Sequence, residues 1–308
     1  MEKKSTRQAY GEALAKLGKE NKDIVVLEAD LSKSTMTAYF QKEFPERHIN
    51  LGIAEADMMA TAAGIATTGK IPFASTFAHF AAGRAFDQIR NSIVYPRLNV
   101  KICPTHAGVS LGEDGGSHQS VEDVALMRSL PGMVVLSPAD AVETEKMIYA
   151  VAQYEGPVYV RLGRLNIPVL YDDSYKFEIG KAHTLREGND VAIIATGLMV
   201  YEAMEAAKIL EEKGIEARVI NMSTIKPLDE ETVLKAAKEC KFIVTSEEHS
   251  VIGGLGGAVA EYLSEAYPTK VVRHGIYDVF GQSADGDTML NNYKLRAKDI
   301  AEAVLKNK

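Results

Sequence analysis

The residues best suited to catalysis or binding lie in one polar, glycine-rich segment, residues 105–123 (THAGVSLGEDGGSHQSVED). His106 and His118 can donate or accept protons near neutral pH, and Asp114 between them is an anionic hydrogen-bond acceptor. Glycine permits positive φ and a close approach of the backbone to a ligand. The glycines of the segment are Gly108, Gly112, Gly115 and Gly116. Such a set of groups suits a polyhydroxylated substrate. A metal site is the alternative, but this histidine spacing with one interposed carboxylate matches no standard ligand pattern.

A helix is expected directly after this segment. Ser120 is predicted to be the N-cap of a helix that starts at Val121, with Asp123 three residues after the cap. A long loop without secondary structure inside a compact domain is usually either functional or disordered. Because the predicted cap anchors this loop, function is favoured over disorder.

A second group of candidate residues combines one carboxylate with two aromatic rings. Glu55 opens a helical pattern of small and apolar residues (AEADMMATAAGIA). By default it is a glutamate favoured by the helix dipole. In such surroundings it could instead have a raised pKa and exchange a proton with a heterocycle. Phe77 and Phe80 are by default core residues, but they could also form a wall against which a flat ring stacks.

Further polar residues follow the predicted strands, and ligands bind beyond the carboxyl ends of strands in open parallel sheets. The rim defined in this way contains Asp30, Ser34, Thr105, Arg161 and Arg164 in addition to Glu55, Phe77 and His106. Each alone is best explained as a solvated loop end, whereas together they favour a site. The glycine cluster at 253–257 does not fit the dinucleotide-binding pattern G-x-G-x-x-G, so we interpret it as the start of a closely packed helix.

The elements that must position these residues alternate between apolar β-rich runs and helical patterns, which is typical of doubly wound α/β domains. The first unit has predicted strands at 24–29, 49–51, 71–74, 98–103, 133–136 and 157–161, and helices at 6–20, 55–68, 80–94, 121–129 and 140–154. The second has strands at 191–195, 216–221, 241–245 and 270–273, and helices at 199–213, 229–239, 255–266 and 295–306. We therefore expect two domains, 1–165 and 185–308, joined by a linker at 166–184.

Composition limits the functional classes. The chain has 308 residues, 46% of them hydrophobic and 25% charged, with a formal net charge of −7. This charge argues against a general nucleic-acid or anionic-membrane binder, since those partners favour a basic surface. Cys103 and Cys240 are expected to be buried thiols. The N-terminal residues lack the apolar core of a signal peptide and no run reaches membrane-spanning length, so a cytoplasmic protein is expected.

Together these motifs resemble the transketolase family. The strings THAGVSLGEDGGSHQSVED, NLGIAEADMMATAAGIA and PFASTFAHF look like the substrate loop, the glutamate segment and the aminopyrimidine-binding segment of that family. STRQAYGEAL, ADLSKST and GRLNIP match further segments in order, and IGGLGGAVAEYL and FGQSADGD look like its C-terminal domain. The resemblance implies a pyrimidine-binding domain followed by a transketolase C-terminal domain.

The resemblance also implies roles for individual residues. Glu55 would hydrogen-bond the aminopyrimidine of thiamine diphosphate, with Phe77 and Phe80 packed on the ring and with Asp30 and Leu31 beside the cofactor. A separate group would bind the sugar phosphate or its distal hydroxyls: Arg7, Ser34, His106 and Arg164.

In the same comparison Asp114 would read the hydroxyl next to the carbonyl, and His118 would contact the carbonyl region of the donor. The catalytic set would then be Glu55, His106, Asp114 and His118. A third aromatic residue expected three positions after Phe80 is Gly83 here, so the ring pocket must be completed differently.

The family's diphosphate-anchoring pattern, a GDG motif with Asn-Asn well downstream, is missing: Gly286-Asp287 lies too close to Asn291-Asn292. The resemblance therefore implies the C-terminal subunit of a two-chain transketolase. Its partner chain would hold the diphosphate and a magnesium or calcium ion, in an α2β2 assembly. The implied reaction moves a two-carbon ketol unit from a ketose phosphate to an aldose phosphate.

Three alternatives stay open at this point. The β subunit of a 2-oxo acid dehydrogenase shares the two-domain plan, but it is not expected to carry HxxxxLGEDGxxHQ. A deoxyxylulose-phosphate-synthase-like subunit usually differs before the Asp-Gly of this loop. A non-catalytic regulatory homologue would keep the fold alone, although the retained Glu55, His106, Asp114 and His118 argue against it.

Overall fold

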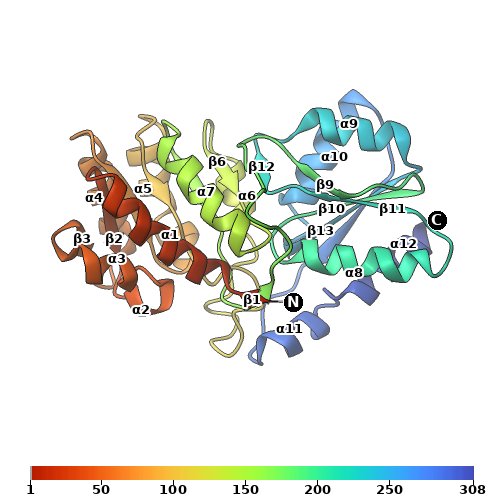
Figure 1. Cartoon of the computed structure of the whole chain (residues 1–308), viewed down its shortest axis with the longest axis horizontal. Coiled ribbons are helices and arrows are strands. Elements are labelled where there is room, and N and C mark those ends of the chain that lie inside the picture. The colour runs from red at the N-terminus through yellow and green to blue at the C-terminus, as the bar shows by residue number, and fades with distance from the viewer. Residues whose placement is uncertain (1) are drawn as a thin grey trace.

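The computed structural model describes residues 2–308, which form two α/β lobes lying side by side (Figure 1). Each lobe is built on one largely parallel sheet covered by helices on both faces. The prediction of an α/β fold with two doubly wound units is confirmed.

The first sheet has the strand order β12-β6-β7-β5-β4-β2-β3. Its strands are β2 (Ile24–Glu28), β3 (His48–Asn50), β4 (Ile71–Ser75), β5 (Lys101–Ile102), β6 (Val134–Leu136), β7 (Val158–Val160) and β12 (Thr224–Lys226). All neighbours are parallel except β12, which runs antiparallel to β6. All five residues of β2 are buried, and four of them are apolar, as a parallel sheet covered on both faces requires.

Two layers of helices cover this sheet. One face is covered by α1 (Thr6–Glu20), α3 (Ala38–Glu43) and α7 (Ala141–Gln153). The other is covered by α4 (Glu55–Ala66), α6 (Asp123–Arg128) and the segment 80–94. We predicted one regular helix over 80–94. It is instead divided into the π-helical turns η2 (Phe80–Arg84) and η3 (Ile89–Val94), with α5 (Phe86–Gln88) between them.

The second sheet has the order β14-β13-β10-β11-β9. Its strands are β9 (His183–Arg186), β10 (Val191–Ala195), β11 (Ala217–Asn221), β13 (Ile243–Ser250) and β14 (Val271–Ile276). Only β9 pairs in an antiparallel sense. In Figure 1, α9 (Glu230–Glu239) and α10 (Leu255–Ala266) lie above this sheet, and α8 (Met199–Glu211) and α12 (Ala297–Asn307) lie below it.

Several short elements escaped prediction. They are β1 (Lys3–Lys4), α2 (Ser32–Thr35), η1 (Pro45–Arg47), β8 (Ile167–Pro168) and α11 (Gly286–Asn292). β1 pairs with β8 in a small antiparallel ribbon, and β12 carries the chain from the second lobe back into the first sheet. The two lobes are therefore joined by strand pairing as well as by the connecting segment.

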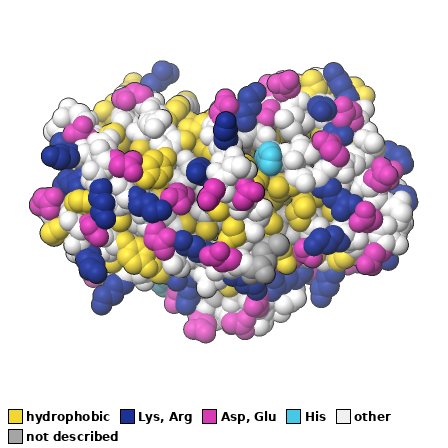
Figure 2. Space-filling view, in the orientation of Figure 1, with side chains coloured by type: hydrophobic (Ala, Val, Ile, Leu, Met, Phe, Trp, Pro, Cys, Tyr) yellow, Lys and Arg dark blue, Asp and Glu magenta, His cyan; other side chains and the backbone are white. Residues whose placement is uncertain are grey.

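Acidic and basic side chains are interspersed over the face shown in Figure 2, which has no continuous area of a single charge sign. Within residues 2–308, no helix has both the length and the apolar character needed to cross a lipid bilayer.

Candidate functional site

The aromatic residues and histidines predicted from sequence meet at one place beyond the ends of β4 and β5. Phe77 pairs with Thr105 in an isolated parallel bridge, which brings the two segments together. The Phe77 ring stacks on His106 with centroids 3.9 Å apart and on Phe80 at 5.7 Å, and Phe80 meets His118 edge-on at 5.1 Å. Four predicted site residues thus form one aromatic cluster.

Glu55 begins α4 and is only 5% exposed. Its Oε1 accepts a hydrogen bond from Nη1 of Arg84 at 2.9 Å. The same guanidinium lies over the Phe80 ring, 4.0 Å from its centroid. Arg84, which the sequence analysis missed, therefore links the carboxylate to the aromatic cluster. No sequence pattern indicated this contact, because the segment that carries Arg84 was expected to be one regular helix.

His106 is held as a neutral imidazole. It has a positive φ of 61° and is 3% exposed. Its Nδ1 lies 2.7 Å from the Thr105 hydroxyl. Burial, together with the nearby guanidiniums of Arg7 and Arg164, lowers the pKa of His106 to about 3. A neutral ring can exchange hydrogen bonds with a hydroxyl group without adding positive charge.

Two guanidiniums, Arg7 and Arg164, line a hollow of about 310 Å³ beside this cluster. Burial and the neighbouring Arg164 lower the pKa of Arg7. Arg7 Nη1 donates to the Ser34 carbonyl at 2.7 Å, and Arg164 Nη1 donates to the Leu111 carbonyl at 2.5 Å. The exposed Asp114 carboxylate lies 3.7 Å from Arg164, and Glu113 and Asp285 also line the hollow. The two guanidiniums supply hydrogen-bond donors that suit a compact anion.

Asp30 and Leu31 lie at the end of β2. The Asp30 backbone N–H donates to Asn50 Oδ1 at 3.0 Å, so this turn is tied to β3. The Leu31 N–H donates to Oε2 of Glu28 at 2.8 Å. Burial raises the pKa of Glu28 to about 7. Glu28 was not predicted as a site residue. It ends an apolar strand, and the sequence does not show that its carboxylate holds the turn at Asp30 and Leu31.

The loop that carries His106, Asp114 and His118, called here the 105–120 loop, is anchored differently from the prediction. Ser120 does not cap a helix. Its carbonyl accepts from Gly108 N–H at 2.8 Å, which closes the neck of the loop. Helix α6 begins at Asp123, after Glu122, whose side chain accepts from Val121 N–H and makes no hydrogen bond that caps the helix. The Asp123 carboxylate does not complete the predicted capping box with Ser120, because it forms a buried ion pair of 2.9 Å with Arg161. Arg161 is therefore a structural residue.

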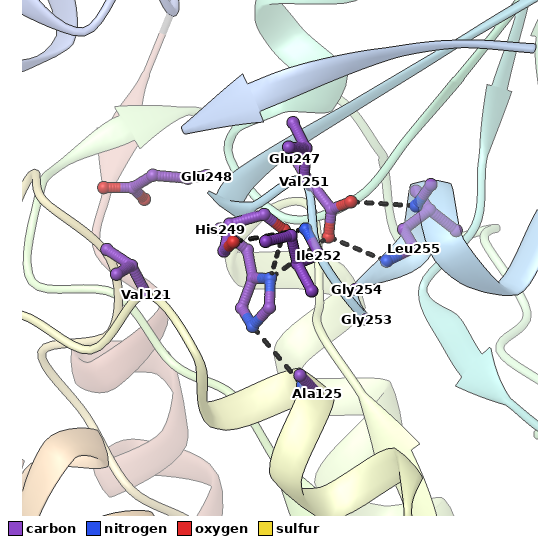
Figure 3. Close-up of polar contacts among 12 residues, drawn as sticks. Val121, Ala125, Glu247, Glu248, His249, Val251, Ile252, Gly253, Gly254 and Leu255 are labelled. Atoms are coloured by element: carbon purple, nitrogen blue, oxygen red, sulfur yellow. Dashed lines mark hydrogen bonds and ion pairs between the residues drawn. The ribbon is translucent and has the colours of Figure 1, made fainter. Parts of the chain in front are cut away.

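The glycine cluster at 253–257, called here the glycine turn, is the start of a helix, as predicted. Gly254 precedes α10, and the Glu247 carboxylate accepts from the N–H groups of Leu255 and Gly256 at 2.7 and 2.8 Å (Figure 3). A Cβ on Gly254 would lie 2.0 Å from Glu247 Oε2. Because an internal carboxylate already satisfies this helix N-terminus, it is not free to bind a phosphate.

Two family models match the chain: "Transketolase, pyrimidine binding domain" over residues 2–169, and "Transketolase, C-terminal domain" over residues 180–300. A putative transketolase C-terminal section from Methanocaldococcus jannaschii is 52% identical over 98% of this chain and 96% of its own length. The 6-deoxy-6-sulfo-D-fructose transketolase subunit SqwH of Clostridium sp. (strain MSTE9) is 42% identical over 96% of this chain and 92% of its own length.

Among solved structures, one described as "Split gene transketolase, inactive beta4 tetramer" is 55% identical, with a TM-score of 0.90. The match covers 98% of this chain and 97% of that one. The similarity therefore extends over both lobes and over nearly the whole of the related chains.

Proposed function

This chain belongs to the transketolase family, and we propose that it is the subunit of a two-chain enzyme that transfers a two-carbon ketol unit from a ketose phosphate to an aldose phosphate. The observation that carries this proposal is the joining of a buried carboxylate, Glu55, to the stacked Phe77 and Phe80 through Arg84. Dependence on thiamine diphosphate follows from the family.

The residues at this position fit the aminopyrimidine of thiamine diphosphate. The Thr76 hydroxyl, next to Phe77, is buried without a hydrogen-bond partner in the described chain. A Cβ at Gly83 would meet only His79 Cε1, at 3.9 Å, so there is open space where a third aromatic residue is typical of the family. A polar heterocycle would use both the orphaned hydroxyl and the open space.

The chemistry that thiamine diphosphate supplies when bound is a nucleophilic carbon and an electron sink. The chain's own contributions are proton handling and positioning. Glu55 would hold the proton at the ring nitrogen, while Phe77 and Phe80 fix the ring plane and Asp30 and Leu31 lie beside the cofactor.

For the substrate, Arg7, Arg164, Ser34 and the neutral His106 would bind the phosphate or the distal hydroxyls. The two guanidiniums that line the hollow support an anionic group at that end. Asp114 and His118 would contact the hydroxyl and carbonyl region near the reacting carbon.

We propose that the diphosphate and its magnesium or calcium ion are bound by a partner chain, in an α2β2 assembly. Among residues 2–308 no group of three or more His, Cys, Asp or Glu side chains is placed to hold a metal ion. The names of the relatives, a "C-terminal section" and a "split gene" protein, support a division between two chains.

The test is co-expression with a candidate diphosphate-binding chain, followed by a ketol-transfer assay with thiamine diphosphate and a divalent ion. Glu55→Gln should lower turnover by about 10²- to 10⁴-fold, the range for a general acid–base group. The matched control is Asp57→Asn, since Asp57 lies in the same first helical turn but is exposed. Both changes remove a favourable helix-dipole charge, yet only the first should affect turnover.

Normal turnover in Glu55→Gln would refute the role of that residue. A regulatory homologue would instead bind no thiamine diphosphate on mixing with the partner chain, which calorimetry measures directly.

A further inference from the structure

The 105–120 loop is unusual because most of it is buried. Only Glu113, Asp114 and Ser117 are exposed within it, at the tip. A buried loop has no water to satisfy its backbone groups, so each N–H needs a partner from the protein. The partners of this loop show what holds it in place.

One partner is Glu248, which belongs to β13 of the second lobe and is 4% exposed. Its Oε1 accepts a hydrogen bond from the backbone N–H of Ser110 at 2.6 Å. Gly108, with φ +81°, is packed so closely that a Cβ there would lie 2.2 Å from the Glu248 carboxyl carbon. The Arg161 guanidinium joins the Glu248 carbonyl, at 2.9 Å, to the Ser120 carbonyl, at 3.2 Å.

A second contact from the same lobe holds the C-terminal end of the loop. Gln119 Nε2 donates to the Gln282 carbonyl at 2.8 Å and to the Val109 carbonyl at 3.1 Å. Gly281 lies against this side chain, since a Cβ there would be 1.4 Å from Gln119 Oε1. The second lobe therefore contacts the loop near both ends. Residues 281–286 also pack against Gly112, Gly115 and Gly116, which leaves the side chains of Glu113, Asp114 and Ser117 exposed.

Strand β13 directs the side chains of Glu247 and Glu248 to two different parts of the molecule. Along β13 the side chains alternate in direction, as strand geometry requires. Figure 3 shows Glu247 directed to α10 and His249 directed to Ala125, whereas Glu248 points away from both. Glu247 and Glu248 are thus adjacent buried carboxylates that accept backbone N–H groups in different places.

We propose that Glu248 is a positioning residue through which the second domain fixes the 105–120 loop, so that Asp114 and His118 face the substrate. The contacts between Glu248 and the loop do not depend on the proposed function, whereas the effect on substrate binding rests on it. A displacement of about 1 Å at a site that positions substrate can lower activity about 10²-fold, so a remote carboxylate can matter to the reaction.

Hydrogen–deuterium exchange on the full chain tests the contact without any assay of activity. In Glu248→Ala, peptides covering residues 108–112 should exchange at least about tenfold faster than in the wild type. Glu248→Gln keeps an acceptor oxygen for Ser110 N–H and should retain most of the protection. Glu247→Ala is the matched control: it should expose residues 255–257 but leave residues 108–112 protected.

Unchanged exchange at 108–112 in Glu248→Ala would overturn the proposal, and so would equal opening of the loop in Glu247→Ala. If Glu248→Ala fails to fold, the proposal is tested by comparing Glu248→Gln with the wild type. Loss of protection from exchange at residues 108–112 in Glu248→Gln would contradict the role of Glu248 as a hydrogen-bond acceptor.

Kinetics of the assembled two-chain enzyme test the consequence. Glu248→Ala should raise KM for the ketose about tenfold and lower kcat/KM about 10²-fold. The dissociation constant of thiamine diphosphate should change less than about threefold, because the cofactor residues lie on other elements. Glu247→Ala should leave KM near the wild-type value. Failure of the wild type to transfer ketol units would refute the proposed function and leave the exchange result standing.

Discussion

The two glycine-rich segments of this chain, the 105–120 loop and the glycine turn, have opposite uses. Both combine close backbone packing with a buried carboxylate from β13. In the glycine turn, Glu247 accepts hydrogen bonds from the N-terminus of α10, and residues 253–257 carry no polar side chain that could contact a ligand. In the 105–120 loop, Glu248 satisfies the backbone near the neck, and Asp114 and His118 remain at the tip.

The difference shows that a glycine cluster alone does not identify a binding site. The deciding feature is whether the chain itself already satisfies the donors and acceptors that the glycines expose. Glycine in the turn allows a carboxylate of the same chain to approach the helix. Glycine in the loop allows a second lobe to hold the backbone while polar side chains face outward.

The largest expected effect that separates the two segments is on catalysis. Asp114→Ala in the loop should lower kcat/KM of the assembled enzyme about 10²-fold, as expected when a preorganised polar contact to a reacting substrate is lost. Stability should change by less than about 1 kcal/mol, since the exposed contact with Arg164 spans 3.7 Å. Steady-state kinetics and a thermal melt measure the two effects. The control beside the glycine turn is Ile252→Ala, an exposed residue whose loss should leave kcat/KM unchanged. Equal losses of kcat/KM in both variants would contradict the difference between the two segments.

A smaller effect is expected on stability, and here the turn should be the more sensitive segment. Gly254→Ala places a Cβ against the Glu247 carboxylate and should lower the free energy of unfolding by about 1–3 kcal/mol. Urea denaturation monitored by circular dichroism gives the value. Gly257→Ala is the matched control, because its Cβ would have only ordinary contacts at 3.4 Å. Within a helix that change should stabilise, by up to about 1 kcal/mol. Destabilisation of similar size in both variants would contradict the account of Glu247.

The smallest expected effect is on the pH dependence of stability, and it belongs to the loop. The pKa of His106 is about 3 in the folded chain, below its ordinary 6.5. Between these values the unfolded chain binds a proton that the folded chain does not, so the wild type loses stability as pH falls below 6.5. His106→Gln removes this loss. The stability of the wild type relative to the variant should therefore fall by about 1 kcal/mol between pH 6.5 and 5.5.

Unfolding curves at pH 8, 6.5 and 5.5 provide the measurement, with pH 8 as the reference at which the histidine is neutral in both states. A difference between the two proteins that stays constant over this range would show that His106 is not shielded from protonation.

The alternating pattern of this chain was sufficient to predict both parallel sheets, because buried runs such as IVVLE and VAIIA carry a strong signal. The irregular segment 80–94 was not predictable, since π-helical turns use the same apolar spacing as an α-helix to within one residue. β12 was also missed. Its three residues, Thr-Ile-Lys, form a strand only because the edge of β6 accepts them.

For the candidate site, the strand-end rule placed Phe77 and His106 on one rim, and the two rings are stacked with centroids 3.9 Å apart. The rule could not separate Arg161, which follows a strand but turns inward to Asp123. Nor could it find Glu248, which lies 138 residues from its partner Ser110 along the chain. Contacts between lobes depend on how the two sheets dock, and no local pattern records this.

The return of β12 to the first sheet limits how this polypeptide could be divided. A break in the connecting segment would leave β6 as an unpaired edge strand in the first fragment, open to pairing with other chains. In the second fragment, Lys226 would lose its two carbonyl partners, Arg128 and Leu130. Separately expressed halves should therefore aggregate, and an engineered enzyme in three pieces would need its cut placed outside this crossing.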